Sequence, residues 1–293
     1  MSDLDGLLAH AALLPDAPGQ AALRVLGAEL AKYAATLDLD HAWSLVATDP
    51  RAYLGRHDSG PIVALRRYDA GEVSAVHSHA WTILYALAGG GALERWQPDD
   101  AGRARLIGAE ATAAAPVIID AYEAHRQRTT AGALELVVIG DYSDSSPRAD
   151  YVASEDSLVF AEQFAGFLAA WQAADIGALA PFYAEDVFLD LHVPKWRVQM
   201  EGSQRVLAFI DAEEFHPDYS VPRWSVAPTP DGWTLELQAH YSHNGDRSFS
   251  EMVHRVRTAS PGGPITSHSV YCTGIWDRAT IDGLRHSGGL LRL

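Results

Sequence analysis

The sequence predicts two domains: an all-β barrel or sandwich that follows a helical segment, and then an α+β domain. The chain has 293 residues, roughly the length of two domains. Between about residues 60 and 140, short apolar runs alternate with turn residues, whereas beyond residue 158 a helical period precedes long alternating segments. A polar segment rich in serine and aspartate separates the two patterns. We therefore place the domains at 1–145 and 158–293, joined by a linker at 146–157.

The first domain is expected to begin with helices over residues 1–46. Leu23, Leu26, Leu30 and Tyr33 recur there at spacings of three and four residues, as on one face of a helix. Strands are predicted after residue 60, and GGG, PDDAGR and TTAG supply turns between them. The predicted strands are PIVALRRY, EVSAVHSH, TILYALAG, ALERWQ, APVIIDA and ELVVIGDY.

The second domain is expected to start with an amphipathic helix, a break near Gly177 and a short second helix. A strand near 185–191 and a helix near 202–213 follow. Helices that precede a run of antiparallel strands are typical of an α+β domain. The predicted strands of that run cover 220–228, 232–243, 248–258 and 265–277.

Composition and charge limit the functions of the chain. Asp and Glu number 38 against 22 Lys and Arg, so the formal net charge is −16. Such a surface repels phosphate backbones and anionic lipids, and we expect neither nucleic-acid nor membrane partners. Cys272 is the one cysteine, which excludes an intrachain disulfide and a thiolate metal cluster. The acidic N-terminal sequence does not read as a secretion signal, so a cytoplasmic location is expected.

Two histidines in a predicted strand form the clearest chemical signal. His77 and His79 are two residues apart, so both imidazoles point to the same face of a strand. His125 follows 46 residues later, at the end of another predicted strand. Neutral imidazoles suit Fe, Zn, Cu or Ni, and three of them leave coordination positions open for a substrate or oxygen. The alternative is that these are ordinary surface histidines.

The first domain resembles the cupin superfamily. The resemblance rests on Gly71 six residues before the His77–His79 pair, on the β-rich context and on a later single histidine. Residues 56–140 look more narrowly like the cysteine dioxygenase-like branch of the thiol dioxygenases. The matching segments are YLGRHD with Tyr53 and Arg56, VHSH, LERW, and IIDAYEAHR with Asp120, His125 and Arg126.

This resemblance implies that His77, His79 and His125 hold Fe(II). It also implies that Arg56 binds a substrate carboxylate, a role that suits the fork of a guanidinium group. Tyr53 and Trp81 are further candidates for substrate binding. The alternative for Arg56 is an ordinary surface arginine, and the alternative for Trp81 is aromatic packing in the barrel. The metal could equally be Zn(II) or Ni(II).

The sequence also departs from these patterns. Ile83 and Leu84 stand where the general cupin pattern has a glutamate, and Glu94 lies further on, where a carboxylate on the barrel surface is expected. The barrel cysteine of some thiol dioxygenases is missing, and so is their Ser-His-Tyr relay. The metal ligands therefore carry over, whereas the thiol substrate does not.

Residues 158–293 resemble the nuclear-transport-factor-two-like (NTF2-like) fold, particularly its SnoaL-type members. The resemblance rests on the helical segment FAGFLAAWQAADIGALAPFYAED, on EGSQRVLAFI and on the four long strands. It implies a cone-shaped, curved antiparallel sheet that encloses a pocket. Such folds serve isomerases, cyclases, dehydratases and binding proteins, so the fold does not decide the chemistry.

Strand phase suggests acid–base candidates in the second domain. His254 shares a face with Met252 and Val256, and the turn SPGG brings that histidine roughly opposite His268 on the next strand. Asp190 and His192 share a face of another strand. By the SnoaL-type resemblance, Asp190, His192 and His268 are expected inside the cone, with His254 facing His268. The alternative is a pair of satisfied core histidines and a local Asp–His hydrogen bond.

We thus expect an enzyme: a mononuclear non-haem Fe(II)-dependent dioxygenase that uses O2 and a small organic substrate. One alternative keeps the metal as Zn(II) or Ni(II) and makes it a Lewis acid for a redox-neutral isomerase or lyase. Another places acid–base cyclase or isomerase chemistry, or ligand binding, in the second domain. A homodimer is a further expectation, by analogy with cone-shaped sheets that pair through their exposed faces.

Overall fold

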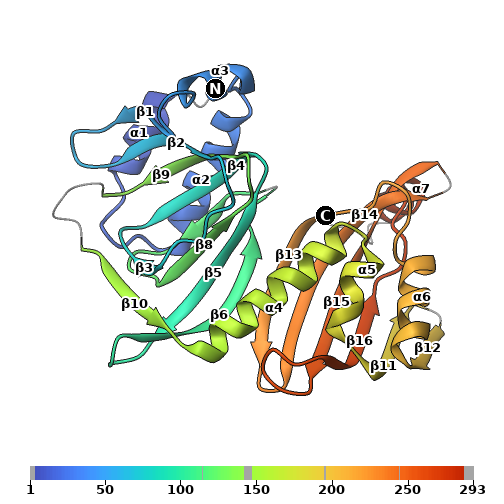
Figure 1. Cartoon of the computed structure of the whole chain (residues 1–293). Coiled ribbons are helices and arrows are strands. Elements are labelled where there is room, and N and C mark those ends of the chain that lie inside the picture. Colours follow the sequence, from blue (N-terminus) through green and yellow to red (C-terminus); the bar gives the residue numbers. More distant parts are fainter. Residues whose placement is uncertain (1–3, 114, 142–146, 195, 244, 287–293) are drawn as a thin grey trace. The chain divides into compact units, whose positions relative to one another are not determined.

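The computed structural model describes residues 4–113, 115–141, 147–194, 196–243 and 245–286, without the side chains of residues 284 and 285. The chain divides into two units, Met1–Ser154 and Glu155–Leu293 (Figure 1). In the described residues, no helix combines the length and apolar character that a membrane span requires.

The first unit opens with helices whose apolar faces cover a β-sheet. The helices are α1 (Leu4–Ala12), α2 (Gln20–Ala34) and α3 (Leu39–Leu45). As the sequence predicts, Leu23, Leu26 and Leu30 lie on one face of α2 and are fully buried. They pack on Leu134 and Leu136 of the sheet in one hydrophobic cluster. Figure 1 shows the helices of this unit beside the sheet that carries β9.

The sheet under these helices has the strand order β1-β2-β9-β4-β7. Its strands are β1 (Arg51–Arg56), β2 (Ile62–Tyr68), β9 (Ala133–Ile139), β4 (Thr82–Ala88) and β7 (Val117–Ile119). Every residue of β9 is buried, because the helices cover one face and the barrel interior covers the other. Val137 and Ile139 lie in the interior cluster, and by strand alternation Glu135 faces the same way.

A second set of strands closes the barrel. The order is β10-β3-β8-β5-β6, and β10 also pairs with β6, which closes this ring of strands. The strands are β3 (Val76–Ser78), β8 (His125–Thr129), β5 (Gly91–Pro98), β6 (Arg103–Ala111) and β10 (Ala149–Ala153). The first half of the chain is therefore a β-barrel preceded by helices, although its membership of the cupin superfamily stays a prediction.

The predicted linker at 146–157 is wrong in part. Within that range, β10 pairs with β3 and β6, and helix α4 begins at Glu155. The backbone N–H and C=O groups of this polar segment form hydrogen bonds with the edges of β3 and β6. The composition of the segment gave no sign of this pairing. The predicted boundary between residues 145 and 146 lies within the segment 142–146, which is outside the described residues.

The second unit is an α+β fold. Its helices are α4 (Glu155–Gln172), α5 (Ile176–Leu179), the 3-10 turn η1 (Ala180–Phe182), α6 (Ser203–Glu213) and α7 (Arg278–His286). The sheet order within this unit is β13-β14-β15-β16-β11-β12. Its strands are β11 (Tyr183–Val193), β12 (Trp196–Glu201), β13 (Ser220–Thr229), β14 (Gly232–His243), β15 (Asp246–Thr258) and β16 (Ile265–Cys272). The pair β11–β16 is parallel, and the sequence did not predict β12 or α7.

Aromatic side chains fill the interior of the second unit. Phe167 and Trp171 of α4 are buried, and Phe167 contacts Trp233 of β14 with ring centroids 5.8 Å apart. The cavity beside Trp171 and His268 measures about 10 Å³, room for about one water molecule. This cavity among the described residues is far smaller than the pocket that the NTF2-like resemblance implied, because large aromatic rings occupy the space beside it.

Close packing in the first unit gives a stability prediction at Gly140. A Cβ built on Gly140 lies 2.1 Å from the ring of Trp81, which is 2% exposed, and the Gly140 N–H donates to the Trp81 carbonyl oxygen. We expect Gly140→Ala to lower the free energy of unfolding by about 1–3 kcal/mol through overpacking. Calorimetric melting checks this. Gly19→Ala is the control, because no heavy atom lies within 4 Å of its added Cβ, and an equal loss in both variants would contradict the packing argument.

Candidate metal centre

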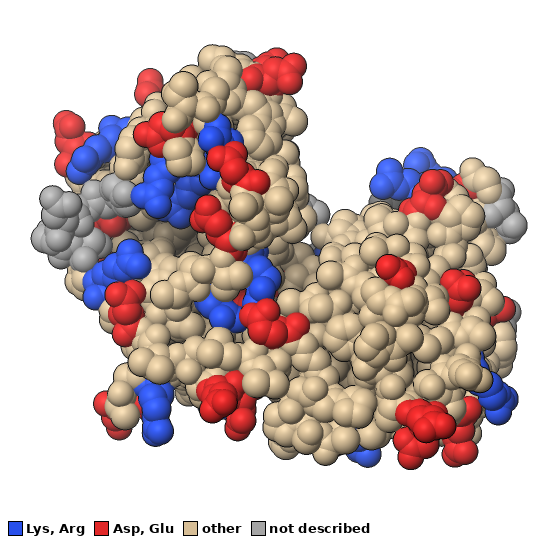
Figure 2. All heavy atoms as spheres, in the orientation of Figure 1, with Lys and Arg blue, Asp and Glu red and all other residues tan. Residues whose placement is uncertain are grey.

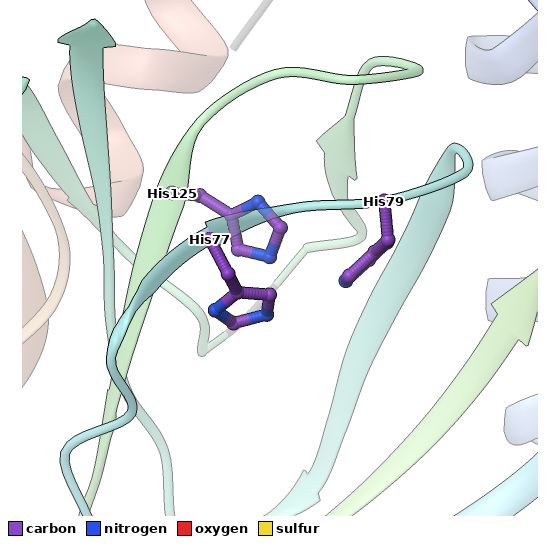
Figure 3. Close-up of side chains that lie close together, drawn as sticks. All are labelled: His77, His79 and His125. Carbon is purple, nitrogen blue, oxygen red and sulfur yellow. The ribbon is translucent and has the colours of Figure 1, made fainter. Parts of the chain in front are cut away.

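The three predicted histidine ligands converge in the first unit. His77 and His125 are direct cross-strand partners on β3 and β8, and His79 follows β3 by one residue. One ligand atom from each imidazole lies within 4.8 Å of the other two. The ring centroids are 4.4 to 5.3 Å apart. The three rings face a common point (Figure 3).

Backbone carbonyls orient each of the three rings. The Nδ1 atom of His77 lies 2.8 Å from the carbonyl oxygen of Ala75, that of His79 lies 2.6 Å from Ala80, and that of His125 lies 2.9 Å from Glu123. A carbonyl can only accept, so each Nδ1 carries the proton and each Nε2 presents a lone pair. This is the arrangement in which backbone carbonyls hold metal-binding histidines.

The electrostatic environment keeps these imidazoles neutral. Burial lowers the pKa of His77, and it lowers the pKa of His79 to about 4 and of His125 to about 3. The positive charges of Arg66 and Arg148 act in the same direction on His77 and His79. Metal ions bind neutral imidazole, so at neutral pH the three rings are already in the form that a divalent cation needs. The donor set therefore fits a mononuclear metal.

Loop geometry joins the two segments that carry the ligands. Tyr122 has a φ of 63°, in the left-handed region that few side chains adopt, and its N–H donates to the His79 carbonyl oxygen at 2.7 Å. On the other side of His125, Arg95 of β5 forms ion pairs with Glu110 and Glu123. Since the carbonyl of Glu123 accepts from the His125 ring, Arg95 holds the residue that orients this ligand.

The histidines open onto a cavity of about 420 Å³, a size that suits a small ligand. Its lining includes Arg51, Arg66 and Tyr68 from β1 and β2, and Gln127 from β8. The Tyr68 hydroxyl donates to Glu135 at 3.2 Å, and the Gln127 amide donates to the same carboxyl at 2.6 Å. Burial raises the pKa of the Glu135 carboxyl. The lining carries three arginines, Arg148 among them, together with Glu72 and Asp141. Figure 2 shows blue and red side chains interspersed over this face of the first unit.

Three predicted substrate-binding residues lie elsewhere. Arg56 is at the far end of β1 opposite Ile62, roughly 16 Å along the strand from Arg51 at about 3.3 Å per residue. Tyr53 is 58% exposed, and Trp81 is buried in the core beneath the helices. The described residues that line the cavity include none of the three, whereas they do include Arg66 and Arg51.

Glu94 differs from its expected place on the barrel surface. Glu94 as a whole is 3% exposed, and its carboxylate accepts from Arg126 at 2.5 and 3.1 Å, with Arg128 3.6 Å away. Arg126 also stacks over the ring of Trp96. Neighbouring residues of a strand point to opposite faces. The His125 imidazole therefore lies on the face of the histidine cluster, and the Arg126 guanidinium lies on the other face of β8.

In the second unit, two predicted acid–base histidines form a buried chain with a tyrosine. His254 Nδ1 lies 2.9 Å from His268 Nε2, and His268 Nδ1 lies 2.9 Å from the Tyr183 hydroxyl. Both histidines are fully buried, and in the described part of the chain His254 Nε2 has no hydrogen-bond partner. Glu214, which the sequence did not single out, borders the small cavity beside His268, and burial raises its pKa to about 7.

Asp190 and His192 do not lie in this interior. Asp190 pairs in register with Ser269, and Leu189 with His268, so Asp190 is on the opposite face of the sheet. Its carboxylate binds Arg197 at 2.5 and 2.6 Å and His192 at 3.2 Å. The hydrogen bonds from Arg197 lower the pKa of Asp190 to about 2. Asp190 is thus an ion-paired residue of the outer face.

The buried histidines predict a pH-dependent stability. Burial lowers the pKa of His268 to about 3 and that of His254 well below its ordinary value of 6.5. Below about pH 6.5 the unfolded chain binds protons that the folded chain rejects, so stability is lost as the pH falls. Each histidine contributes about 1.4 kcal/mol per pH unit to this slope. Urea titrations from pH 7.5 to 5, followed by NMR signals of β16 amides, measure the slope.

The matched variant for this prediction is His268→Gln. Glu214 acts in the opposite direction between about pH 7 and 4.5, because its pKa is raised. Glu214 is present in both proteins, so the difference between their pH slopes of the unfolding free energy measures the contribution of His268. We expect the slope of the variant to be shallower by about 1.4 kcal/mol per pH unit. Equal slopes would show that His268 is protonated in the folded chain.

Comparisons with known proteins add little to this geometry. No protein-family model and no curated protein matches the sequence. An NTF-2 like protein of unknown function from Burkholderia xenovorans LB400 is 16% identical, with 48% of this chain and 99% of that chain covered and a TM-score of 0.33. The epoxide hydrolase/cyclase-like enzyme SalBIII, with a role in pyran ring formation in salinomycin, is 16% identical, at 42% and 99% coverage and a TM-score of 0.35.

A third similar structure is an LEH-like epoxide hydrolase of M. tuberculosis. It is 13% identical, with 39% of this chain and 83% of that chain covered and a TM-score of 0.31. Each of these matches covers less than half of this chain, and at these scores we take neither an activity nor a site from them.

Proposed function

We propose that the first unit is a metal-dependent catalytic domain that acts on a small anionic organic substrate. The observation that carries this proposal is the set of three neutral imidazoles, each with Nε2 presented to a common point, on the wall of a cavity that also bears arginines. Three histidine ligands leave coordination positions of a divalent metal for substrate and a further small molecule.

The residues of the chain have separable roles in this proposal. His77, His79 and His125 hold the cation, and Arg66 binds an anionic group of the substrate beside it. Gln127 and Tyr68 both donate to Glu135, so their side chains are held in fixed positions on the cavity wall. The surrounding apolar residues, such as Ile119 and Leu84, exclude water from one side of the cavity.

Fe(II) with O2 as co-substrate is our first choice within this proposal, and the imidazole set is what supports it. Bound iron would supply the one-electron chemistry that O2 activation requires. Zn(II) or Ni(II) would instead polarise a substrate carbonyl, which is the redox-neutral alternative. The comparisons with known proteins do not support oxygenase chemistry.

The second unit offers a different candidate function, acid–base catalysis by the Tyr183–His268–His254 chain. Its hydrogen bonds favour proton transfer. The cavity of about 10 Å³ beside His268 admits no organic substrate in this conformation. We therefore rank this site second.

Oxygen uptake tests the proposal. The metal-free protein is loaded anaerobically with Fe(II) or with Zn(II) and offered a panel of small organic acids, including thiol acids. We expect O2 consumption and incorporation of label from ¹⁸O₂ with the iron form alone, and loss of both in His77→Ala. Turnover by the zinc form without O2 would establish the redox-neutral alternative. Turnover that survives in His77→Ala would overturn the metal site and direct attention to the second unit.

A further inference from the structure

Two arginines stand side by side on the wall of the cavity. Arg51 of β1 and Arg66 of β2 are direct partners in an antiparallel ladder, and both line the cavity that the metal-binding histidines share. Arg66 acts electrostatically on His77 and His79, so it lies near the metal ligands. Arg51 is exposed, which places its side chain nearer the solvent. The pair therefore forms an inner and an outer cationic group.

Strand alternation explains why only one arginine of the dipeptide Arg66–Arg67 enters the cavity. Arg66 continues the inward face of Ile62 and Ala64, which lie in the interior cluster. Arg67 points the other way, where it donates to the carbonyl oxygens of Val46 and Ala47 and pairs with Asp69. Arg67 is thus a structural residue, and Arg66 keeps its charge turned toward the metal ligands.

Acidic groups balance the charges around this pair only in part: Glu135 interacts electrostatically with Arg66, and Glu72 and Asp141 also line the cavity. Like charges directly opposite each other on paired strands destabilise the pairing. Arg148, a third arginine of the cavity wall, has Asp150 at 3.5 Å, but within the described residues Arg51 has no acidic partner. A bound ligand with two negative groups would relieve the repulsion, and each guanidinium could grip one carboxylate through two hydrogen bonds.

We infer that this cavity selects a substrate with two separated acidic groups, a short-chain dicarboxylate, held by Arg66 at the inner end and Arg51 at the outer end. The inference rests on the proposed function in taking this cavity as the substrate site, and it adds the substrate class. Neighbouring antiparallel strands place the two Cα atoms about 4.5–5.5 Å apart, so the two acidic groups are separated by a short carbon chain.

Isothermal titration calorimetry on the full chain tests this inference. The probes are the dicarboxylates malonate, succinate, glutarate and adipate, and each is compared with its own half-amide, which keeps the shape and loses one charge. Both the metal-free and the Zn(II)-loaded protein are titrated. We expect at least one diacid to bind about tenfold or more tightly than its half-amide, because the second charge gains a charge-assisted hydrogen bond.

Three variants locate the effect. Arg51→Gln and Arg66→Gln are expected to bring the ratio of diacid to half-amide affinity close to one. Arg105→Gln removes the same charge from an exposed position on β6, where Arg105 donates to Gln97, and is expected to keep the ratio. Circular dichroism confirms folding of each variant, and Arg51 is exposed, so at least its variant is expected to fold.

The outcomes separate the inference from the proposed function. Equal affinities for all diacids and their half-amides, or an unchanged ratio in Arg51→Gln, would overturn the inference even if the protein binds a metal. The protein could instead show a high ratio of diacid to half-amide affinity that both Arg51→Gln and Arg66→Gln abolish, and yet bind no metal. That result would support the dicarboxylate site and refute the metal-dependent function.

Discussion

Replacing His125 by alanine is expected to lower the bound metal from about one ion per chain to less than a tenth of that value. His125 is buried, and its Nδ1 is held by the Glu123 carbonyl, so its Nε2 is fixed toward the other two imidazoles. Even the loss of a group that orients a ligand typically costs 10–100-fold in metal affinity, and loss of the ligand itself costs more. Metal analysis by plasma mass spectrometry, on protein purified without a chelator or histidine tag, measures the ratio.

The control for this prediction is His41→Ala. His41 lies on α3, where its backbone N–H donates to Asp38. This variant is expected to keep the full metal content. Equal metal loss in the two variants would indicate adventitious binding by surface histidines, and full retention in His125→Ala would refute the three-histidine centre.

Glu94→Ala is expected to destabilise the first unit by about 3–5 kcal/mol. The carboxylate and its partner Arg126 are both buried, with side chains 4% and 7% exposed. Removing one partner of a buried ion pair leaves the other charge without compensation in a poorly solvated place. Hydrogen–deuterium exchange of the amides of β5 and β8, which carry the two residues, gives the opening free energy of this part of the barrel.

An exposed ion pair on the same barrel supplies the comparison. Arg103 pairs with Asp99 at 3.2 Å, with side chains 70% and 46% exposed. Exposed pairs contribute little because water screens them, so Arg103→Ala is expected to change the protection far less. If the two variants lost equal protection, the buried pair between β5 and β8 would have no special role in the barrel.

The convergence of the three histidines could be predicted because strand geometry places them together. Residues two apart share a face, so His77 and His79 converge whichever way the strand points. The third ligand needed only a neighbouring strand, and the structure pairs His125 directly with His77. The clustering of the three imidazoles thus follows from spacing that the sequence displays, and metal binding by them stays a proposal.

The arginines of the cavity could not be predicted in the same way. Residues Ile62, Val63, Ala64 and Leu65 are all buried, because helices cover one face of β2 and the barrel interior lies behind the other. The pattern of the strand therefore does not say whether Arg66 or its neighbour faces inward. The resemblance to thiol dioxygenases directed attention to Arg56 instead, which lies at the opposite end of β1 from Arg51.

The second unit shows a similar limit. Strand phase brought His254 and His268 together, although the ladder pairs His254 with Val270 and the histidines meet diagonally. Phase also put Asp190 and His192 on one face, but which face becomes the interior depends on where the helices pack. The filling of the interior by Phe167, Trp171 and other aromatic rings depends on that packing as well.

Anomalous diffraction from crystals of the metal-loaded protein tests the three-imidazole centre most directly. Data collected on either side of the absorption edge of the bound metal locate that metal without any assumption about its ligands. We expect one peak in the first unit, coordinated by the Nε2 atoms of His77, His79 and His125, with each Nδ1 still on its backbone carbonyl. A peak bound through Nδ1 or by other residues, or no peak at this position, would contradict it.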